Sequence, residues 1–193
     1  MIQQLVVASN NSHKIEEMSS LLGSSFLLMR LTDISCFEEL PETQDTLEGN
    51  SLQKAQYVFD RYKVSCFADD SGLEVEALHG EPGVYSAMYA GAQRNAEDNI
   101  NLLLQKLEDV RNRRAQFRTV ITLVEPSRTT SFEGVVKGEI TTLKRGTSGF
   151  GYDPVFQPQG YTKTFAEMTL VEKNRISHRA IALNKLVDYL KKR

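Results

Sequence analysis

The stretch "CFADDSGLE", residues 66–74, places two aspartates, Asp69 and Asp70, directly after a short apolar run. Such a run before polar residues is typical of a buried strand that is coming to its end. Ser71 and Gly72 follow the aspartates, and both residue types favour turns. The local sequence therefore predicts a strand that ends in a turn. It leaves two uses open for the aspartates, as ordinary turn residues or as an acidic pair that holds a metal.

The segments before and after this stretch alternate between strand and helix patterns. A short β-branched run at 4–9 is followed by a polar turn and an amphipathic pattern, with Asn11 or Ser12 as the helix cap. The mixture of strands and helices along the chain predicts an α/β fold. The other predicted elements are helices at 50–62, 95–110 (capped by Asn95) and 177–192, and strands at 64–69, 115–125 and 129–143. In the helix at 50–62, one face is expected to carry Leu52, Ala55, Phe59 and Tyr62, with Lys54 on another face.

The composition of the 193-residue chain is that of a globular protein, with 40% hydrophobic and 25% charged residues. Its length suits a single domain over residues 1–193, built as one body or two lobes. With 23 basic and 25 acidic residues the net charge is -2, which disfavours a nucleic-acid partner. Cys36 and Cys66 are too few for a disulfide framework or a zinc spacing, and both are expected to be buried. The sequence contains no signal-peptide pattern and no apolar run of membrane length, so we expect a cytoplasmic protein without a membrane partner.

Three segments carry residues that the fold alone explains poorly. The first is the polar, glycine-punctuated region 67–91, and the second is the long irregular region 144–161, which keeps several aromatic residues. The third is 172–180, where four basic side chains are expected at a helix N-terminus, the end at which the helix dipole disfavours cations. These four are Lys173, Arg175, His178 and Arg179. Each segment also has an ordinary interpretation, as a turn, a packed loop and a solvated helix face.

Together, the three segments supply the groups that a metal–nucleotide site requires. Proteins bind Mg²⁺ through one or two carboxylates plus the phosphates of the substrate. Aromatic side chains stack on bases, and lysine or arginine neutralises phosphate charge. The polar turn before the first helix, with Lys14 in the first helical turn, is a further candidate phosphate site.

Six blocks of the sequence carry a resemblance to a known family. They are "SNNSHKIEE", "ETQDTLEGNSLQKA", "FADDSGLEVEAL.GEPGVYSA.YAG", "RG..GFGYDPVF.P.G", "TFAEM" and "EKN.ISHRA.AL". In this order, and from residue 9 to residue 183, they resemble the Ham1/RdgB family of non-canonical purine nucleoside triphosphate pyrophosphatases.

The resemblance implies a two-lobed α/β fold around a long mixed sheet with flanking helices, with the active-site cleft between the lobes. It also implies a homodimer that uses Mg²⁺ to hydrolyse ITP, dITP and XTP to the monophosphate and pyrophosphate. By position, Asp70 matches the catalytic, metal-associated carboxylate, and Asp69 is a second candidate metal ligand. The matched substrate-binding residues are Ser9, Asn10, Asn11, Ser12, His13, Lys14, Lys54, Ser71, Phe150, Gly151, Tyr152, Asp153, Lys173, His178 and Arg179.

The chain departs from the family pattern at two positions. Gly49 stands where many members of the family have a glutamate, and the resemblance implies that this glutamate helps to hold the metal. Met88 stands where arginine is usual. Either a nearby acid replaces that glutamate, or the metal relies on Asp70, water and the triphosphate. The nearby acids are Glu42, Asp45 and Glu48. The departures leave open a non-catalytic nucleotide-binding protein on the same fold. A Maf-like pyrophosphatase for modified pyrimidines is disfavoured by the "SHR" and "FGYD" blocks.

The expected chemistry follows from the charge of the substrate. Lys14 and Lys54, with Mg²⁺, would neutralise the triphosphate, and Asp70 would accept the proton of the attacking water. Hypoxanthine and xanthine carry an acceptor oxygen at position six, where adenine has an amino donor. Donors from His178, Arg179 or backbone N–H groups would therefore bind the oxygen of hypoxanthine or xanthine. The same donors would be left unpaired when adenine is bound.

Overall fold

The computed structural model describes residues 3–22 and 26–192, and the chain divides into two compact units. The first unit comprises Met1–Asp70, Thr119–Gly134 and Arg179–Arg193. The second unit comprises Ser71–Arg118 and Val135–His178. The predicted site residues are thus distributed over both units, and the cleft that the resemblance implies stays a prediction.

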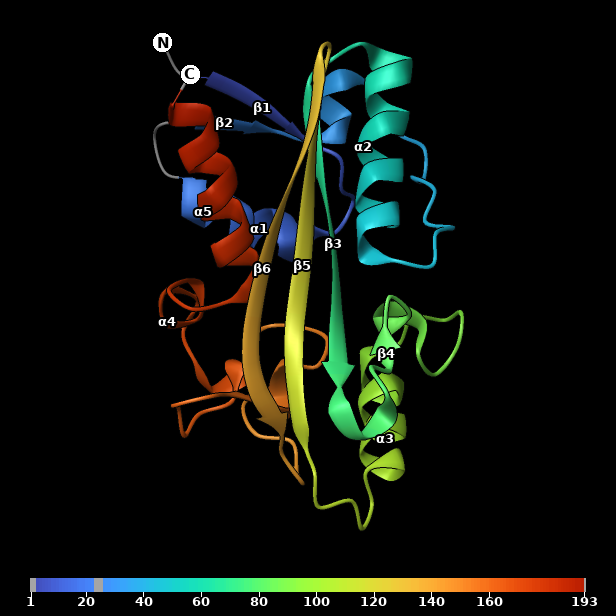
Figure 1. The fold of residues 1–193 in the computed structure, drawn as a ribbon, viewed down its shortest axis with the longest axis vertical. Coiled ribbons are helices and arrows are strands. Elements are labelled where there is room, and N and C mark those ends of the chain that lie inside the picture. Colours follow the sequence, from blue (N-terminus) through green and yellow to red (C-terminus); the bar gives the residue numbers. More distant parts are fainter. Residues whose placement is uncertain (1–2, 23–25, 193) are drawn as a thin grey trace. The chain divides into compact units, whose positions relative to one another are not determined.

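Helices and strands are interspersed along the chain, and the strands form a mixed sheet (Figure 1), which confirms the predicted α/β class. The sheet order is β2-β1-β3-β5-β6-β7, and β4 pairs with β3. β2 and β3 run parallel to β1, whereas β4 is antiparallel to β3 and β7 to β6. The strands are β1 Gln3–Val7, β2 Phe26–Met29, β3 Cys66–Val75, β4 Pro82–Gly83, β5 Arg114–Glu125, β6 Arg128–Ile140 and β7 Phe156–Pro158. The helices are α1 Ser12–Leu22, α2 Leu47–Tyr62, α3 Ala96–Lys106, α4 Leu170–Asn174 and α5 His178–Lys191.

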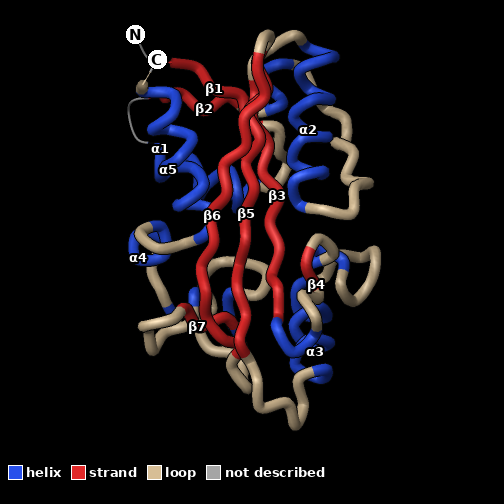
Figure 2. Tube along the Cα trace, viewed as in Figure 1, coloured by secondary structure: helices blue, strands red, loops and turns tan. Residues whose placement is uncertain are grey.

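β3 continues through the residues that were predicted to form a turn. Asp69, Asp70, Ser71 and Gly72 all lie inside this ten-residue strand, which is unbroken in Figure 2. A Cβ atom on Gly72 would lie 2.3 Å from the carbonyl oxygen of Gly83 in β4. The glycine is therefore required by the close approach of a neighbouring strand, which the local sequence does not reveal, and the predicted turn is wrong.

The core of the first unit consists of two clusters of apolar side chains. In one cluster α1 and α5 pack against strand residues, and in the other α2 does. Val7, Phe67 and Leu123 belong to the cluster with α1 and α5, while Ala55 and Val58 of α2 join a separate cluster. Cys36 and Cys66 are buried, as predicted. Leu52 belongs to the predicted apolar face of α2 but is 42% exposed, because the buried stripe runs through Leu47, Ala55 and Val58 and includes polar side chains between them.

The core of the second unit is rich in aromatic rings. Phe117 of β5 meets Phe156 edge to face with ring centres 4.7 Å apart, and Phe165 stacks near Phe117 at 6.0 Å. α3 covers this cluster with Ile100 and Leu103, and Asn95 caps the helix by accepting from the Asp98 N–H, as predicted. Among the described residues, no helix is both long and apolar enough to cross a membrane.

Candidate active site

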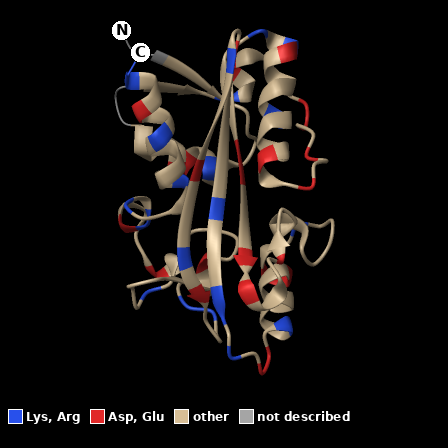
Figure 3. Ribbon diagram, in the orientation of Figure 1, with Lys and Arg blue, Asp and Glu red and all other residues tan. Residues whose placement is uncertain are grey.

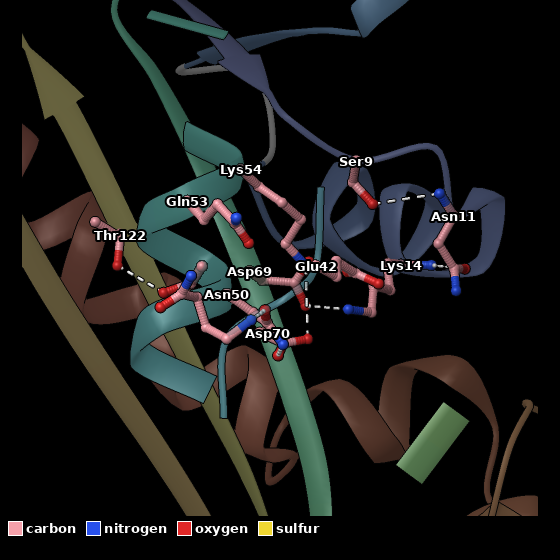
Figure 4. A network of polar contacts seen from close by, with 12 residues as sticks. Ser9, Asn11, Lys14, Glu42, Asn50, Gln53, Lys54, Asp69, Asp70 and Thr122 are labelled. Atoms are coloured by element: carbon pink, nitrogen blue, oxygen red, sulfur yellow. Dashed lines mark hydrogen bonds and ion pairs between the residues drawn. The ribbon is translucent and has the colours of Figure 1, made fainter. Parts of the chain in front are cut away.

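Two lysines from different helices contact the adjacent aspartates of β3 in the first unit (Figure 4). Nζ of Lys14, in α1, lies 3.0 Å from Oδ2 of Asp69, and Nζ of Lys54, in α2, lies 3.5 Å from Oδ1 of Asp70. Asp69 is fully buried, while Asp70 and Lys54 are 8% and 5% exposed. Charged groups are buried at a high energetic cost unless they are paired. These two lysines and two aspartates, the charge quartet, are therefore a built site and not a solvated face.

Asp69 has a further cationic partner in Arg179. Nε of Arg179 lies 3.3 Å from Oδ2 of Asp69, and Nη1 of Arg179 ion-pairs with Glu17 of α1. Burial by itself would raise the pKa of Asp69, but Lys14 and Arg179 hold that pKa well below its usual range. The pKa of Arg179 is raised by Glu17 and Asp69 in spite of its burial. Both groups are therefore charged inside the protein.

Glu17 was not singled out from the sequence, because an acid in a helix is usually part of a solvated face. Its spacing is the available signal, since Glu17 comes three residues after Lys14 and so shares its side of the helix. The structure also changes the interpretation of Arg179, whose Nε and Nη1 face carboxylates of the first unit. Its predicted contact with the base stays a prediction.

Asp70 is held by a neutral donor as well as by Lys54. Nδ2 of Asn50 donates to Oδ2 of Asp70 at 3.2 Å. Lys54 also donates to Oε1 of Glu42 at 2.6 Å, so one ammonium group contacts two carboxylates. Burial raises the pKa of Asp70, although the charges of Lys54 and Lys14 oppose the rise. A carboxylate with a raised pKa suits a group that accepts a proton in catalysis.

The segment that carries Glu42 is attached to α2 by side-chain hydrogen bonds. The N–H groups of Thr43 and Gln44 donate to side chains of Gln53 and Asn50, at 2.9 Å in each case. Nε2 of Gln53 donates in turn to Oγ1 of Thr43 at 2.8 Å. Glu42 is thus fixed beside Lys54. Of the three acids that could replace the glutamate absent at position 49, Glu42 is the one that contacts the charge quartet.

Gly49 has no room for a side chain, because this segment lies against it. A Cβ atom there would lie 2.6 Å from Cβ of Gln44 and 3.0 Å from Oγ1 of Thr46, the cap of α2. A glutamate at position 49 is therefore incompatible with the observed path of the segment.

Gly49→Ala tests this contact. Alanine in place of glycine inside a helix ordinarily stabilises by about 1 kcal/mol. Here we expect a loss of about 1–3 kcal/mol in the free energy of unfolding, the usual cost of overpacking. Urea denaturation would compare Gly49→Ala with Leu52→Ala, at an exposed position of the same helix. A Gly49→Ala protein more stable than the wild type would contradict the contact.

The turn between β1 and α1 is organised by its own side chains. Oγ of Ser9 accepts from the Asn11 N–H at 3.2 Å, and Oδ1 of Asn11 accepts from the Lys14 N–H at 3.1 Å. Asn11 is therefore the cap of α1, one of the two predicted possibilities. Residues 10–13 are exposed, at the N-terminus of an eleven-residue helix. Such a turn can present N–H groups to an anion.

Three of the predicted substrate-binding residues meet in the second unit. Oδ2 of Asp153, which is buried, accepts from the Phe150 N–H at 2.9 Å and from Nζ of Lys173 at 2.6 Å. The Lys173 ammonium lies 5.1 Å from the ring centre of Phe150. The prediction that Lys173 shares a helix start with His178 is wrong, because Thr169 caps the separate helix α4 and Lys173 lies in its last turn.

The other predicted residues of the second unit have different settings. The ring of His178 stacks on Phe117, with centres 4.6 Å apart and 9° between the ring planes. The hydroxyl of Tyr152 donates to the Ser86 carbonyl at 2.9 Å, and burial raises the pKa of Tyr152. Tyr152 therefore anchors the loop that carries Phe150. Of the remaining residues, Ser71 and Gly151 are partly exposed and Met88 is 37% exposed.

The Ham1 family model matches residues 5–189. The chain belongs to the Ham1 family. A dITP/XTP pyrophosphatase from Flavobacterium johnsoniae is 56% identical over 187 residues, which cover 97% of each chain. One from Porphyromonas gingivalis is 50% identical over 98% of each chain. The Ham1 protein of Staphylococcus aureus has a solved structure that is 40% identical, covers 98% of this chain and 99% of its own, and superposes with a TM-score of 0.89.

The Ham1 family assignment confirms the resemblance that the six sequence blocks indicated. The match extends over nearly the whole chain, so the Ham1 fold accounts for both units. The relatives from Flavobacterium johnsoniae and Porphyromonas gingivalis are dITP/XTP pyrophosphatases, which confirms the predicted enzyme class. The roles of individual residues in this Ham1 chain stay predictions.

Proposed function

We propose that the protein is a Mg²⁺-dependent pyrophosphohydrolase that converts ITP, dITP and XTP to the monophosphate and pyrophosphate, and so removes them before they enter nucleic acids. The observation that carries this function is the charge quartet, Lys14, Lys54, Asp69 and Asp70, in a chain related to dITP/XTP pyrophosphatases. It combines fixed cations for phosphate with a carboxylate that can accept a proton.

In this function the two lysines bind phosphate and Asp70 accepts the proton of the attacking water. A triphosphate repels a nucleophile until its charge is neutralised, and preorganised cations in a buried site do this without reorganisation. Asn50 orients the carboxylate of Asp70 through Oδ2. The exposed turn at 10–13 and Ser9 would supply further donors to the phosphates.

The carboxylates around Lys54 fit a divalent cation. Asp70 and Glu42 both contact this ammonium group, and Mg²⁺ needs only one or two protein carboxylates when phosphates complete its shell. Within residues 3–22 and 26–192, no three His, Cys, Asp or Glu side chains form a group that could hold a metal without such help. We assign Asp70 and Glu42 to Mg²⁺, which when bound would withdraw charge from the phosphates. Asp69 stays a candidate ligand that already contacts Lys14 and Arg179.

Base recognition would come from the second unit. Phe150 offers an aromatic face whose position is fixed by Asp153 and Lys173. Ser71, Gly151 and Tyr152 would complete the binding residues there. Donors from His178, or from Arg179 of the first unit, would recognise the oxygen at position six, which adenine lacks.

The family resemblance also leads us to propose a cytoplasmic homodimer without a nucleic-acid or membrane partner. Sedimentation velocity of the purified protein would measure the oligomeric state, and a monomer at micromolar concentration would contradict the dimer.

A substrate panel tests the proposed function. We expect pyrophosphate release from ITP, dITP and XTP with kcat/KM about 10²-fold or more above the value for ATP, since buried donors that lack a partner discriminate strongly. GTP belongs in the panel as well, because guanine keeps the oxygen at position six and differs from hypoxanthine by its two-amino group. Activity should disappear in EDTA and return with Mg²⁺. Similar rates with ATP would refute the selectivity. Tight ITP binding without pyrophosphate release would instead support the non-catalytic alternative.

A further inference from the structure

A cavity of about 870 Å³ in the second unit has four arginines and one glutamate among its eleven described lining residues. It is formed by the loop before β5, the segment after β6 and part of β7. None of the site residues predicted from the sequence is among the described residues that line it. Its charged lining residues are Arg111, Arg113, Arg114, Arg145 and Glu139.

Arg113 fixes the backbone of this cavity. Its Nε donates to the Ile140 carbonyl at 2.6 Å, Nη1 to the Leu107 carbonyl at 2.9 Å and Nη2 to the Thr141 carbonyl at 2.9 Å. All three guanidinium nitrogens are thus used to hold the end of β6 and the loop after α3. The positions on either side of Arg113 are therefore presented by a fixed chain segment, which is what a binding site requires.

Arg111 and Arg114 have no corresponding role in the fold. Both are exposed, and in the part of the chain that the structure describes neither side chain makes an ion pair or a hydrogen bond. The side chain of Arg145 already has two partners. Its Nη2 donates to Oε1 of Gln157 at 2.5 Å, and its Nε lies 3.6 Å from Oε2 of Glu167. β5 is marked by basic residues in Figure 3. Unpaired like charges gathered around a cavity repel one another, and an anion would remove that repulsion.

We propose that this cavity is an anion site for a small phosphate-bearing molecule, with pyrophosphate as the simplest example. The planar guanidinium fork matches two phosphate oxygens at once, which makes arginine the preferred phosphate partner. Thr142 also lines the cavity and can add a neutral donor, whereas Nδ2 of Asn112 already donates to Oε1 of Glu76 at 3.0 Å. The volume falls within the range of small-molecule sites, about 300–1,000 Å³.

The charge pattern favours a small anion over a nucleic acid. The adjoining groove shares Arg114 and Glu139 with this cavity but continues to Glu74 and Glu76, so the basic surface ends there. Binding to a phosphodiester backbone needs a longer basic stripe. The chain as a whole has a net charge of -2, which is also unfavourable for a polyanion.

Nuclear magnetic resonance of the ¹⁵N-labelled protein in EDTA tests the site. Pyrophosphate titrated at constant ionic strength should shift the backbone amides of Asn112, Thr141 and Thr142 with one common dissociation constant. In the Arg111→Gln/Arg114→Gln variant that constant should rise roughly tenfold or more, because two charge-assisted contacts are lost. Parallel titrations with orthophosphate and inosine monophosphate would distinguish a free phosphate ligand from a nucleotide.

The matched control is Arg128→Gln/Lys191→Gln, which removes two exposed positive charges from the first unit. Its dissociation constant should stay within about twofold of the wild-type value, because screened charges at a distance contribute little. An equal loss in the control, unchanged binding in the arginine variant, or stronger shifts with a single-stranded oligonucleotide would each overturn the site. Turnover of ITP by the arginine variant should match that of the wild type, so a failure here is distinct from a failure of the proposed function.

Discussion

Asp70→Asn is expected to lower kcat for ITP by about 10²–10⁴-fold, the usual contribution of a positioned general base. Asparagine keeps an oxygen that can accept from Asn50, but it cannot take the proton of water or hold Mg²⁺ as a carboxylate does. Nucleotide binding should largely survive, since Lys14 and Lys54 remain. Single-turnover pyrophosphate release and equilibrium ITP binding would separate the two effects.

The fold should tolerate Asp70→Asn, which makes the result interpretable. The pKa of Asp70 is raised by burial, so its ionised form is less favourable in the folded protein than in the unfolded chain. Removal of that charge should therefore leave the free energy of unfolding at pH 7 unchanged or slightly increased. Asp60→Asn, at an exposed position of α2, is the matched control and should retain full activity. An Asp70→Asn enzyme within tenfold of the wild-type kcat would refute the assignment.

Arg179→Leu is expected to destabilise the protein by about 3–5 kcal/mol, the cost of removing one partner from a buried ion-pair network. Arg179 is 1% exposed and contacts both Glu17 and Asp69, so leucine leaves two buried carboxylates without it. Arg179→Lys should recover only part of the loss, because an ammonium group cannot reproduce the guanidinium fork. Urea denaturation at pH 7 measures the difference.

The pH dependence gives a second test of Arg179→Leu. In the wild type the depressed pKa of Asp69 means that its contribution to stability is lost as pH falls. In the variant, Glu17 and Asp69 gain stability by protonation as pH falls toward their ordinary pKa of about 4. The difference in unfolding free energy between the two proteins should therefore shrink on acidification.

Arg61→Leu provides the control, because the Arg61 side chain is 59% exposed and its ion pair with Glu38 should contribute less than about 1 kcal/mol. If Arg179→Leu lowers the free energy of unfolding by no more than Arg61→Leu does, the buried ion pairs do not depend on the Arg179 guanidinium. If KM for ITP also rises far more than KM for inorganic triphosphate, Arg179 additionally serves the base, as the resemblance implies.

The element types and the family were predictable because they depend on patterns spread along the chain. The periodic apolar positions of α3 and the cap at Asn95 are local signals, and the structure confirms both. The continuation of β3 through Gly72 was not predictable, since it depends on the approach of Gly83 from another strand. Leu52 was misplaced for a related reason: the buried stripe of α2 includes the polar residues Asn50, Ser51 and Lys54, so the apolar pattern alone does not define it.

The candidate site shows the same division between local and long-range information. The motifs led to Lys14, Lys54, Asp69 and Asp70, and the structure brings these four together in the first unit. Glu17 and Asn50 escaped notice because their importance depends on contacts with Arg179 and Asp70, which are distant in sequence. From the sequence, Glu42 was one of three acids that could replace the glutamate absent at position 49. Its contact with Lys54 in the structure distinguishes it from the other two.

The packing of Gln44 on Gly49 has an evolutionary consequence. Because their Cβ atoms would be 2.6 Å apart, a side chain at position 49 and one at position 44 exclude each other along this backbone path. Relatives with glutamate at position 49 should therefore carry glycine at position 44, or a different course of the segment before α2. The two positions are expected to covary, and a Gly49→Glu change would need Gln44→Gly beside it to be accepted.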